Sequence, residues 1–347
     1  MASSILDVAM KAGVSHTTVS RILRNAEGYT YAPATRQKVL AAARALAYVP
    51  NAAARFMRLK KTRLIGITTQ THNAYATYRL IEKISLCIRQ LGYAAVMIDL
   101  SAPDSAAGGF LDITHLAGAI CMYSKHEREM VGRCVRLGRD LPIVTVRRKV
   151  TDNPSVHMVT SDNAAGLAKA FRHLQELGHR RIGYLGYHEP TSSRQSAYAS
   201  LCRKAGLARQ IFTVPVYAEN NSFLSGMKMA RTVAHHGRIS AVLCEDDEFA
   251  AGLIAGLADL KLNVPGDISV VGFDDLPFAT AVRPRLTTVG VKMDEKADAA
   301  ARLLVALIEG NDVQRALLPG SIVLDAELIV RDSTACLSKK KCPTHAH

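Results

Sequence analysis

From residue 64 onward, the sequence alternates between short apolar runs and longer amphipathic stretches. The first apolar run, Leu64–Thr68, is typical of a buried strand, and the stretch 80–91 that follows is typical of a helix. Further apolar runs at 94–98, 117–122 and 142–146 repeat the pattern. Strands that alternate with helices favour a parallel sheet with helices on both faces. This part of the chain is therefore predicted to have an α/β fold.

The alternation restarts after about residue 160, so two α/β lobes in tandem are expected. Such lobes place a ligand cleft between them, at the carboxyl ends of their strands. The segments expected in the second lobe are a helix at 163–177, a strand at 181–185, a helix at 196–205, a strand at 241–244, a helix at 250–260 and a strand at 268–272.

The first fifty residues follow a different pattern, that of short helices. Ser4 followed by Asp7 predicts a capped helix that runs to about Ala12, where Gly13 supplies a left-handed stop. Ser15 is expected to cap a second helix with a polar first turn. Two short helices joined by a turn that contains glycine predict a helix-turn-helix. The polar first turn is the part that such a motif presents to base edges in the major groove.

A third helix is expected to begin near Pro33, with an apolar stripe within Val39–Leu46. A further helical segment, 51–58, has only about two turns and is too short to be stable alone in water. It is basic, and its apolar residue Met57 has no core to enter within this part of the chain. These properties predict a helix that folds on a partner, and on DNA the partner surface would be the minor groove.

Charge separates the head from the body. Residues 1–63 carry eleven Lys or Arg against two acids, a net charge of +9, within a total of +14. The stretch 332–347 carries +2, which leaves +3 for 64–331. A basic head on a nearly neutral body predicts a nucleic-acid-binding module. The alternative is a helical bundle with a solvated basic face, which fits each sign taken separately but not all of them together.

Composition excludes several classes. With 48% hydrophobic and 21% charged residues the chain is typical of globular proteins, and its apolar runs are too short to cross a bilayer. The N-terminus lacks the basic and apolar regions of a signal peptide. The seven cysteines show no CxxC spacing and are expected to be reduced core thiols of a cytosolic protein. No Walker A, GxGxxG, GxSxG or HExxH motif is found, so no enzyme activity, metal or cofactor is predicted.

These patterns resemble those of one family, the lactose/galactose repressor family of bacterial transcription regulators. The resemblance covers roughly 5–331 and implies a helix-turn-helix head followed by an effector domain with the fold of periplasmic sugar-binding proteins. The segments that carry it are Ile5-Leu-Asp-Val-Ala, Ala12-Gly-Val-Ser, Thr18-Val-Ser-Arg-Ile-Leu, Tyr48-Val-Pro-Asn, Leu177-Gly-His-Arg-Arg-Ile-Gly and Val264-Pro-Gly-Asp-Ile-Ser-Val-Val-Gly-Phe-Asp-Asp.

The expected fold class is an N-terminal all-α helix-turn-helix head plus an α/β two-lobed periplasmic-binding-protein-like effector domain. In such folds the chain crosses between the lobes three times, and we expect crossings near 160, 290 and 320. The resulting domains are 1–50, the DNA-binding head; 51–61, the hinge helix and linker; 62–331, the effector and dimerisation domain; and 332–347, a basic tail expected to be disordered. The first lobe is expected at about 62–160 and 291–320, and the second at about 161–290 and 321–331.

The resemblance also implies which residues contact DNA. His16, Thr17 and Arg21 would read bases in the major groove. Met57 stands where the family usually has a leucine that intercalates in the minor groove, and methionine is similar in size but more flexible. The full predicted DNA-binding set is Ser15, His16, Thr17, Thr18, Ser20, Arg21, Asn25, Asn51, Ala54, Arg55, Met57 and Arg58.

A second set is predicted to bind the effector. Asp247 and Asp274 each follow a predicted strand and would accept hydrogen bonds from ligand hydroxyls, and Arg194 would hold a ligand oxygen or carboxylate. The alternative for each acid is a helix N-cap or a solvated loop charge. The full set is Asn73, Tyr75, Arg147, Arg194, Asn221, Asp247 and Asp274.

Two departures from the family pattern concern the effector. Asn73-Ala-Tyr replaces the usual Asn-Pro-Phe, and Arg147-Arg148 replaces the usual Asp-Arg. Losing an acid and gaining a cation favours an anionic ligand, such as a sugar acid or sugar phosphate. The alternative is that Arg147 faces solvent or pairs with a local acid.

The predicted function is sequence-specific regulation of transcription, in the form of a repressor. Its expected partners are double-stranded DNA with a pseudo-palindromic operator, a small-molecule effector and a second copy of the chain, with no membrane partner. The expected location is the bacterial cytoplasm, on the nucleoid. One rival is a binding protein of transport type, which the basic head argues against. Another is an enzyme on an α/β scaffold, for which no nucleophile–base pair is evident.

Overall fold

The computed structural model describes residues 3–23, 28–48, 62–69, 75–99, 116–122, 131, 141–146, 156–188, 193–215, 221–236 and 239–337. It divides into two compact units, 1–62 and 63–347, which are described separately. The predicted hinge helix 51–58 lies outside the described residues.

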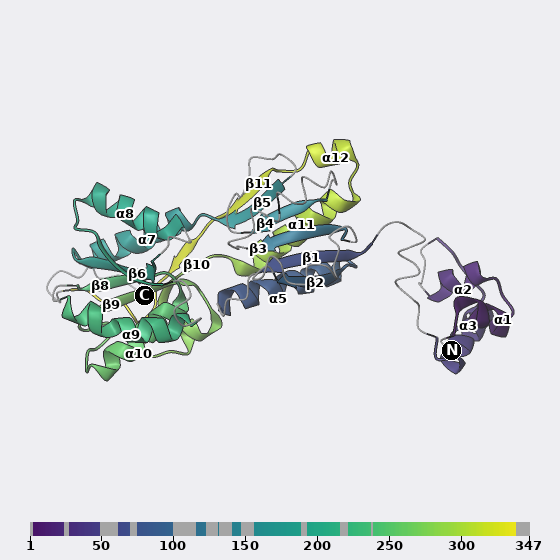
Figure 1. The fold of residues 1–347 in the computed structure, drawn as a ribbon, viewed down its shortest axis with the longest axis horizontal. Coiled ribbons are helices and arrows are strands. Elements are labelled where there is room, and N and C mark those ends of the chain that lie inside the picture. Colours follow the sequence, from purple (N-terminus) through teal and green to yellow (C-terminus); the bar gives the residue numbers. More distant parts are fainter. Residues whose placement is uncertain are drawn as a thin grey trace. The chain divides into compact units, whose positions relative to one another are not determined.

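The described residues of the first unit form three helices, α1 (Ile5–Ala12), α2 (His16–Leu23) and α3 (Pro33–Ala45). Each helix contributes one fully buried valine to a common core, namely Val8, Val19 and Val39. These contacts hold α1 and α2 in the helix-turn-helix that the sequence predicts (Figure 1).

The predicted helix ends are confirmed in this unit. The Ser4 side chain and the Asp7 carboxylate form a reciprocal capping box, in which the Ser4 N–H donates to Asp7 Oδ2 at 2.7 Å. Gly13 ends the helix with φ +67°, a conformation that residues with a side chain rarely adopt. The Thr18 N–H donates to Ser15 Oγ at 3.1 Å, so Ser15 caps the second helix.

In the part of the second unit that the structure describes, the strands form two six-stranded sheets, one in each lobe. In the first sheet every pairing between neighbouring strands is parallel. Its strands, in spatial order, are β11 (Ser321–Leu324), β5 (Val156–Ser161), β4 (Ile143–Val146), β3 (Gly118–Met122), β1 (Leu64–Thr69) and β2 (Ala94–Asp99).

The second sheet is also parallel, except for its antiparallel edge pair β10–β12. Its strands, in spatial order, are β12 (Glu327–Ile329), β10 (Thr287–Gly290), β9 (Ser269–Asp274), β8 (Ala241–Cys244), β6 (Ile182–Tyr187) and β7 (Gln210–Val214). The predicted α/β architecture is confirmed for both lobes.

Helices cover the sheets, as buried parallel strands require. In the first lobe α5 (Tyr75–Gln90) and α11 (Met293–Glu309) enclose a core that includes Ile65 and Ile67 of β1. In the second lobe α7 (Asn163–Glu176) and α8 (Ser193–Ala205) lie on one face, and α9 (Ser222–His235) and α10 (Asp247–Asp259) lie on the other (Figure 1). The short helices η3 (Pro277–Thr280) and α12 (Asp312–Ala316) complete the described helices.

Successive residues of the buried strands supply opposite faces of the second sheet. Val242 packs with α9 and α10, whereas Leu243 packs with α7 and α8. Helix α9 lies close against α10 because glycine stands at the contact. A Cβ at Gly252 would lie 1.9 Å from the Phe223 carbonyl oxygen. Any larger residue at this position would push the two helices apart.

The chain crosses between the lobes three times, and the crossing segments are bonded to each other. The Ser161 hydroxyl donates to the Val291 carbonyl at 2.7 Å, and the Asp162 N–H donates to the Leu324 carbonyl at 2.8 Å. The third crossing lies a few residues after its expected position near 320. Strand β11 pairs in parallel with β5 of the first sheet, so residues 321–324 belong to the first lobe and the chain crosses after Leu324.

The expected disorder from residue 332 is wrong for its first part. Ser333 is fully buried; its hydroxyl donates to the Val270 carbonyl at 2.6 Å and accepts from the Thr287 N–H at 2.8 Å. The Leu337 N–H donates to the Leu177 carbonyl at 3.0 Å. Residues 332–337 therefore form part of the second lobe, and 338–347 lie outside the described residues.

The cysteines also depart from expectation. Cys87, Cys121, Cys202 and Cys244 are free thiols, as predicted. Cys336 is disulfide-bonded, so the prediction of seven reduced thiols is wrong. Cys134 and Cys342 lie outside the described residues.

Candidate functional site

The first turn of α2 forms a polar surface on the helical unit. The side chains of His16 and Thr17 are exposed. Ser15 Oγ lies 2.9 Å from Thr18 Oγ1 and accepts from the Thr18 N–H, so these two hydroxyls form the cap. This arrangement turns His16 and Thr17 outward at the end of the helix. Ser20, also in the predicted set, is half-buried.

Arg21, one turn further along α2, lies against an aromatic ring. Its guanidinium carbon is 3.9 Å from the ring centroid of Tyr29, and Tyr29 is 53% exposed. A guanidinium over an aromatic face is stabilised electrostatically. Tyr29 therefore orients Arg21 at the surface. Tyr29 was not among the predicted residues, because no regular spacing links it to α2.

The remaining six predicted DNA contacts stay predictions. Asn25, Asn51, Ala54, Arg55, Met57 and Arg58 lie outside the described residues.

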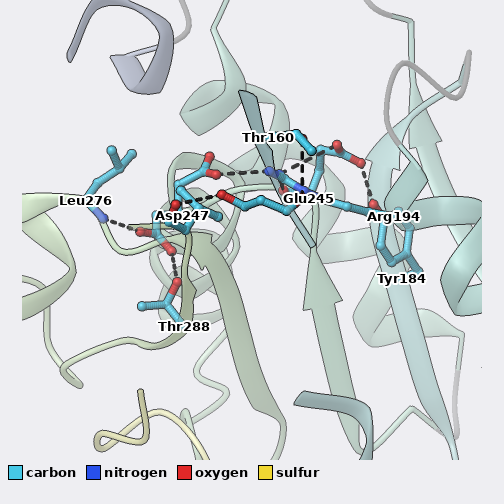
Figure 2. Close-up of polar contacts among 10 residues, drawn as sticks. Thr160, Tyr184, Arg194, Glu245, Asp247, Leu276 and Thr288 are labelled. Carbon is cyan, nitrogen blue, oxygen red and sulfur yellow. Dashed lines mark hydrogen bonds and ion pairs between the residues drawn. The ribbon is translucent and has the colours of Figure 1, made fainter. Parts of the chain in front are cut away.

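In the second unit, Arg194 near the start of α8 is the centre of a buried polar cluster (Figure 2). Its Nη2 donates to Asp274 Oδ1 at 2.9 Å, and its Nη1 donates to the Glu245 carbonyl. The guanidinium carbon lies 3.7 Å from the ring centroid of Phe273. Burial would lower the pKa of Arg194, but the charges of Asp274 and Glu245 outweigh it and raise that pKa. The cluster therefore holds a permanent cation at the ends of strands β8 and β9.

Asp247 is fully enclosed, although it also follows a strand. Its Oδ2 accepts from the Leu276 N–H at 2.6 Å, and its Oδ1 accepts from the Thr288 hydroxyl (Figure 2). Burial raises its pKa well above the ordinary value. A Cβ at Gly272 would lie 2.2 Å from Asp247 Oδ1, so glycine leaves the space that this carboxyl fills. Asp247 therefore braces the segment after β9 from inside the lobe.

The end of β9 and the segment that follows it have an unusual backbone. Asp274 and Asp275 have φ values of +103° and +53°, which are rare for residues other than glycine. Arg194 holds the first carboxylate, and Arg331 Nη2 lies 2.6 Å from Oδ1 of the second. These ion pairs and Asp247 keep the segment in place. Strained backbone held in this way is common at ligand sites.

A pocket of about 330 Å³ lies between this segment, the second crossing and helix α5. Its size is at the lower end of the range for small-molecule sites. Among the predicted effector residues that the structure describes, Asp274 lines it and Tyr75, Arg194, Asn221 and Asp247 do not. The lining residues are Arg79, Lys83, Asp274, Asp275, Leu276, Pro277, Gly290, Val291, Lys292, Met293, Asp294, Glu295, Glu327 and Ile329.

Two acids beside Asp247 were not singled out in the sequence. Asp246 caps α10, because its Oδ1 accepts from the Phe249 N–H at 2.8 Å. Burial, with the nearby charge of Glu248, raises the pKa of Asp246 to about 8. Glu248 Oε2 accepts from the Tyr75 N–H at 3.0 Å. The run of four acids at 245–248 was the sequence signal that could have indicated them. The role of each acid depends on the atoms that surround it.

Two other predicted effector residues have local structural partners. Asn221 caps α9, with its Oδ1 accepting from the Leu224 N–H at 2.9 Å. Tyr75 begins α5, and its ring centroid lies 5.9 Å from that of Phe278. Asn73 and Arg147 lie outside the described residues.

Neither a metal-binding cluster nor a membrane-spanning helix is found among the described residues. They contain no group of three or more His, Cys, Asp or Glu side chains arranged to hold a metal ion. Their helices include none with the length and apolar character needed to cross a membrane.

Similarity to known proteins identifies the two units. Residues 4–51 match the model of the bacterial regulatory proteins of the lacI family, and residues 171–334 match that of the periplasmic binding protein-like domain. The HTH-type transcriptional regulator reg1 of Streptomyces lividans is 30% identical over 346 residues, which cover 96% of this chain and 97% of that protein. The chain belongs to the LacI family.

Other relatives agree with this assignment. The regulator GalR of Escherichia coli (strain K12) is 28% identical over 320 residues, covering 89% of this chain and 90% of that protein. The structure of the lac repressor dimer bound to operator and the anti-inducer ONPF has a TM-score of 0.79 and 25% identity, and the match covers 96% of this chain and all of that one. This LacI-family protein is therefore a DNA-binding transcriptional regulator.

Proposed function

We propose that this LacI-family regulator is a dimeric repressor whose hold on DNA is controlled by a small molecule bound between the lobes. The observation that carries the proposal is that one chain contains both a DNA-binding part and a ligand-binding part. One is a helix-turn-helix with an exposed polar turn, and the other is a two-lobed unit with a pocket lined by both lobes. The relatives named as regulators support it.

In this proposal each head inserts α2 into the major groove. His16 and Thr17 would contact base edges, and Arg21, oriented by Tyr29, would bind a guanine or a phosphate. Paired heads of a dimer would read a pseudo-palindromic operator. Arg55, Arg58 and Met57 remain proposed contacts to phosphates and the minor groove. The protein would act on the nucleoid in the bacterial cytoplasm, without catalysing a reaction.

For the effector we propose a sugar or sugar derivative that binds in the pocket and contacts Asp274. An anionic sugar remains a prediction, which rests on Arg147 and Arg148. A ligand with hydroxyl donors is favoured, because Asp274 lines the pocket with a carboxylate and Arg194 is already paired with that carboxylate. Binding would change the angle between the lobes, separate the two hinge segments of a dimer and lower the affinity for DNA.

The DNA role is tested by selecting genomic fragments with the full chain and measuring their binding. We expect tight binding that weakens steeply with salt, because many phosphates are neutralised. The matched variant lacks residues 1–62 and should bind no fragment specifically. A chain that captures no specific DNA, or a truncated form that still does, would contradict the proposal. The first of these results would favour the transport-type binding protein.

The effector class is tested by calorimetry with neutral sugars, sugar acids and sugar phosphates. We expect binding that is lost when Asp274 is replaced by Asn and kept when the exposed Asp267 is replaced by Asn. Preference for the acids or phosphates would support the role of Arg147. Tight binding of neutral sugars alone would refute the anionic hypothesis.

A further inference from the structure

The two lobes meet at a second place besides the three crossings, at the N-terminus of α5. Tyr75 is the first residue of this first-lobe helix, and its N–H donates to Oε2 of Glu248 in α10 of the second lobe, at 3.0 Å. The ring of Tyr75 packs at 5.9 Å, tilted by 56°, against that of Phe278 in η3 of the second lobe. One polar contact and one aromatic contact therefore join the same two surfaces.

The polar contact satisfies groups that each helix leaves open. The first N–H groups of a helix have no partner within it, and the helix dipole favours a carboxylate at that end. Glu248 lies in the first turn of its own helix α10. It can stabilise that turn at any lobe angle, because both belong to the second lobe. It reaches the N-terminus of α5 only when the lobes lie as they do here.

The contact is connected to the proposed effector pocket through one short segment. Asp274, Leu276 and Pro277 line the pocket, and Phe278 follows them directly. The charge of Asp274 also acts on Glu248, since burial first and Asp274 among the charges raise the pKa of that carboxyl. A molecule that binds at Asp274 therefore acts on the segment that presents Phe278 to Tyr75, and on the charge beside Glu248.

We propose that Glu248, Tyr75 and Phe278 form an interlobe latch, which holds the lobe angle seen here and through which the effector changes the affinity for DNA. Glu248 is then a positioning residue, and Tyr75 acts in lobe closure instead of contacting the effector directly. The latch rests on the proposed function at one point, which is that the lobe angle controls DNA binding.

The test measures the lobe angle directly in the full chain. Spin labels are placed through non-natural amino acids at two exposed positions, Ala316 on α12 in the first lobe and Arg203 on α8 in the second. The labelled chain is mixed with an excess of unlabelled chain, so that distances within one chain are read by pulsed electron resonance. Glu248→Ala should broaden the distance distribution. The ratio of chains at the wild-type distance to chains at other distances should fall by about two- to fivefold.

Two matched variants separate the latch from a general loss of stability. Glu248→Gln keeps a side-chain oxygen that can accept from Tyr75, and should restore part of the wild-type distribution. Glu176→Ala removes an exposed glutamate at the end of α7 and should change nothing. An unchanged distribution in Glu248→Ala, or the same change in Glu176→Ala, would overturn the latch.

The second measurement is the affinity of the same variants for a DNA fragment selected by the wild-type chain. Glu248→Ala should change this affinity by about two- to fivefold, and Glu248→Gln by less. A changed distance distribution with unchanged affinity would overturn the regulatory role of the latch. Failure of the wild-type chain to select any DNA would count against the proposed function, and would leave the distance measurement intact as a test of the contact.

Discussion

Arg21 in the first unit and Arg194 in the second each lie against an aromatic ring, and their surroundings give them different roles. Arg21 stacks at 3.9 Å on Tyr29, whose ring is 53% exposed. Arg194 stacks at 3.7 Å on Phe273, whose ring is fully buried, and also pairs with Asp274. The same local geometry leaves one cation at a surface and commits the other to the interior. An arginine that solvent reaches can contact DNA directly, whereas a buried arginine can only hold neighbouring residues in position.

The largest effect is expected from breaking the buried pair. Arg194→Met should lower the free energy of unfolding by about 3–5 kcal/mol, because Asp274 is left as a buried charge without its cation. Arg21→Met should change it by less than about 0.5 kcal/mol while weakening DNA binding. Urea unfolding measures both. Equal losses of stability in the two variants would show that burial does not distinguish these arginines.

The next effect concerns the segment that Arg194 and Asp247 hold. Gly272→Ala places a Cβ about 2.2 Å from Asp247 Oδ1 and should cost about 1–3 kcal/mol through overpacking. Gly320→Ala is the control, since no atom lies within 4 Å of its added Cβ. Thermal unfolding of the two variants gives the difference. A harmless Gly272→Ala would mean that Asp247 does not need its enclosed position.

A third prediction concerns pH and Asp246, which is buried like Arg194. Its pKa in the folded chain, about 8, lies above its ordinary value of 3.8. The folded state therefore favours the protonated carboxyl of Asp246. This preference stabilises the fold fully below pH 3.8, and the stabilisation is lost as the pH rises through about 8. Asn remains a good N-cap without the charge.

Asp246→Asn should consequently raise the stability at pH 8.5 by about 1 kcal/mol or more, with a much smaller gain at pH 5. Thermal unfolding at the two pH values measures the gain. The exposed Glu176→Gln should show no such dependence on pH. An equal gain in stability at both pH values would show that the Asp246 carboxylate is exposed to solvent.

The smallest effect is expected from the exposed pair in the head. Tyr29→Leu removes the ring under Arg21 and should weaken DNA binding by about two- to fivefold, as expected for a cation–π contact at a surface. Its effect on the unfolding temperature should be slight. Binding to a selected fragment measures the change, and Tyr29→Phe, which keeps the ring, should retain the wild-type affinity. Equal losses in both variants would point to the hydroxyl instead of the ring.

The parts of the fold that local signals specify could be predicted from the sequence. Ser4, Asp7 and Gly13 lie close together along the chain and fix both ends of α1. Strand β5 (Val156–Ser161) was missed, because its residues alternate between buried and half-buried only through pairing with β4 and β11. The lobe boundary expected at about 320 was a few residues early for the same reason, since residues 321–324 pair with a strand that lies about 160 residues earlier.

The candidate site shows the same limit. Asp247 and Asp274 look equivalent in the sequence, since each follows a buried strand. The structure encloses the first among Leu276 and Thr288, and places the second at a pocket. Glu248 and Tyr75 are separated by 173 positions, and no pattern in either segment indicates their contact.

The sequence by itself determined the helix-turn-helix, the basic charge of the head and the α/β character of the body. These features depend on the order of residues within a few turns or one strand, where capping, periodicity and charge act locally. Only the tertiary structure decided the third crossing, the ordered segment 332–337 and the partners of each acid after β8 and β9. Burial and pairing between distant segments set these, because the free energy of a buried polar group depends on the atoms that surround it in space.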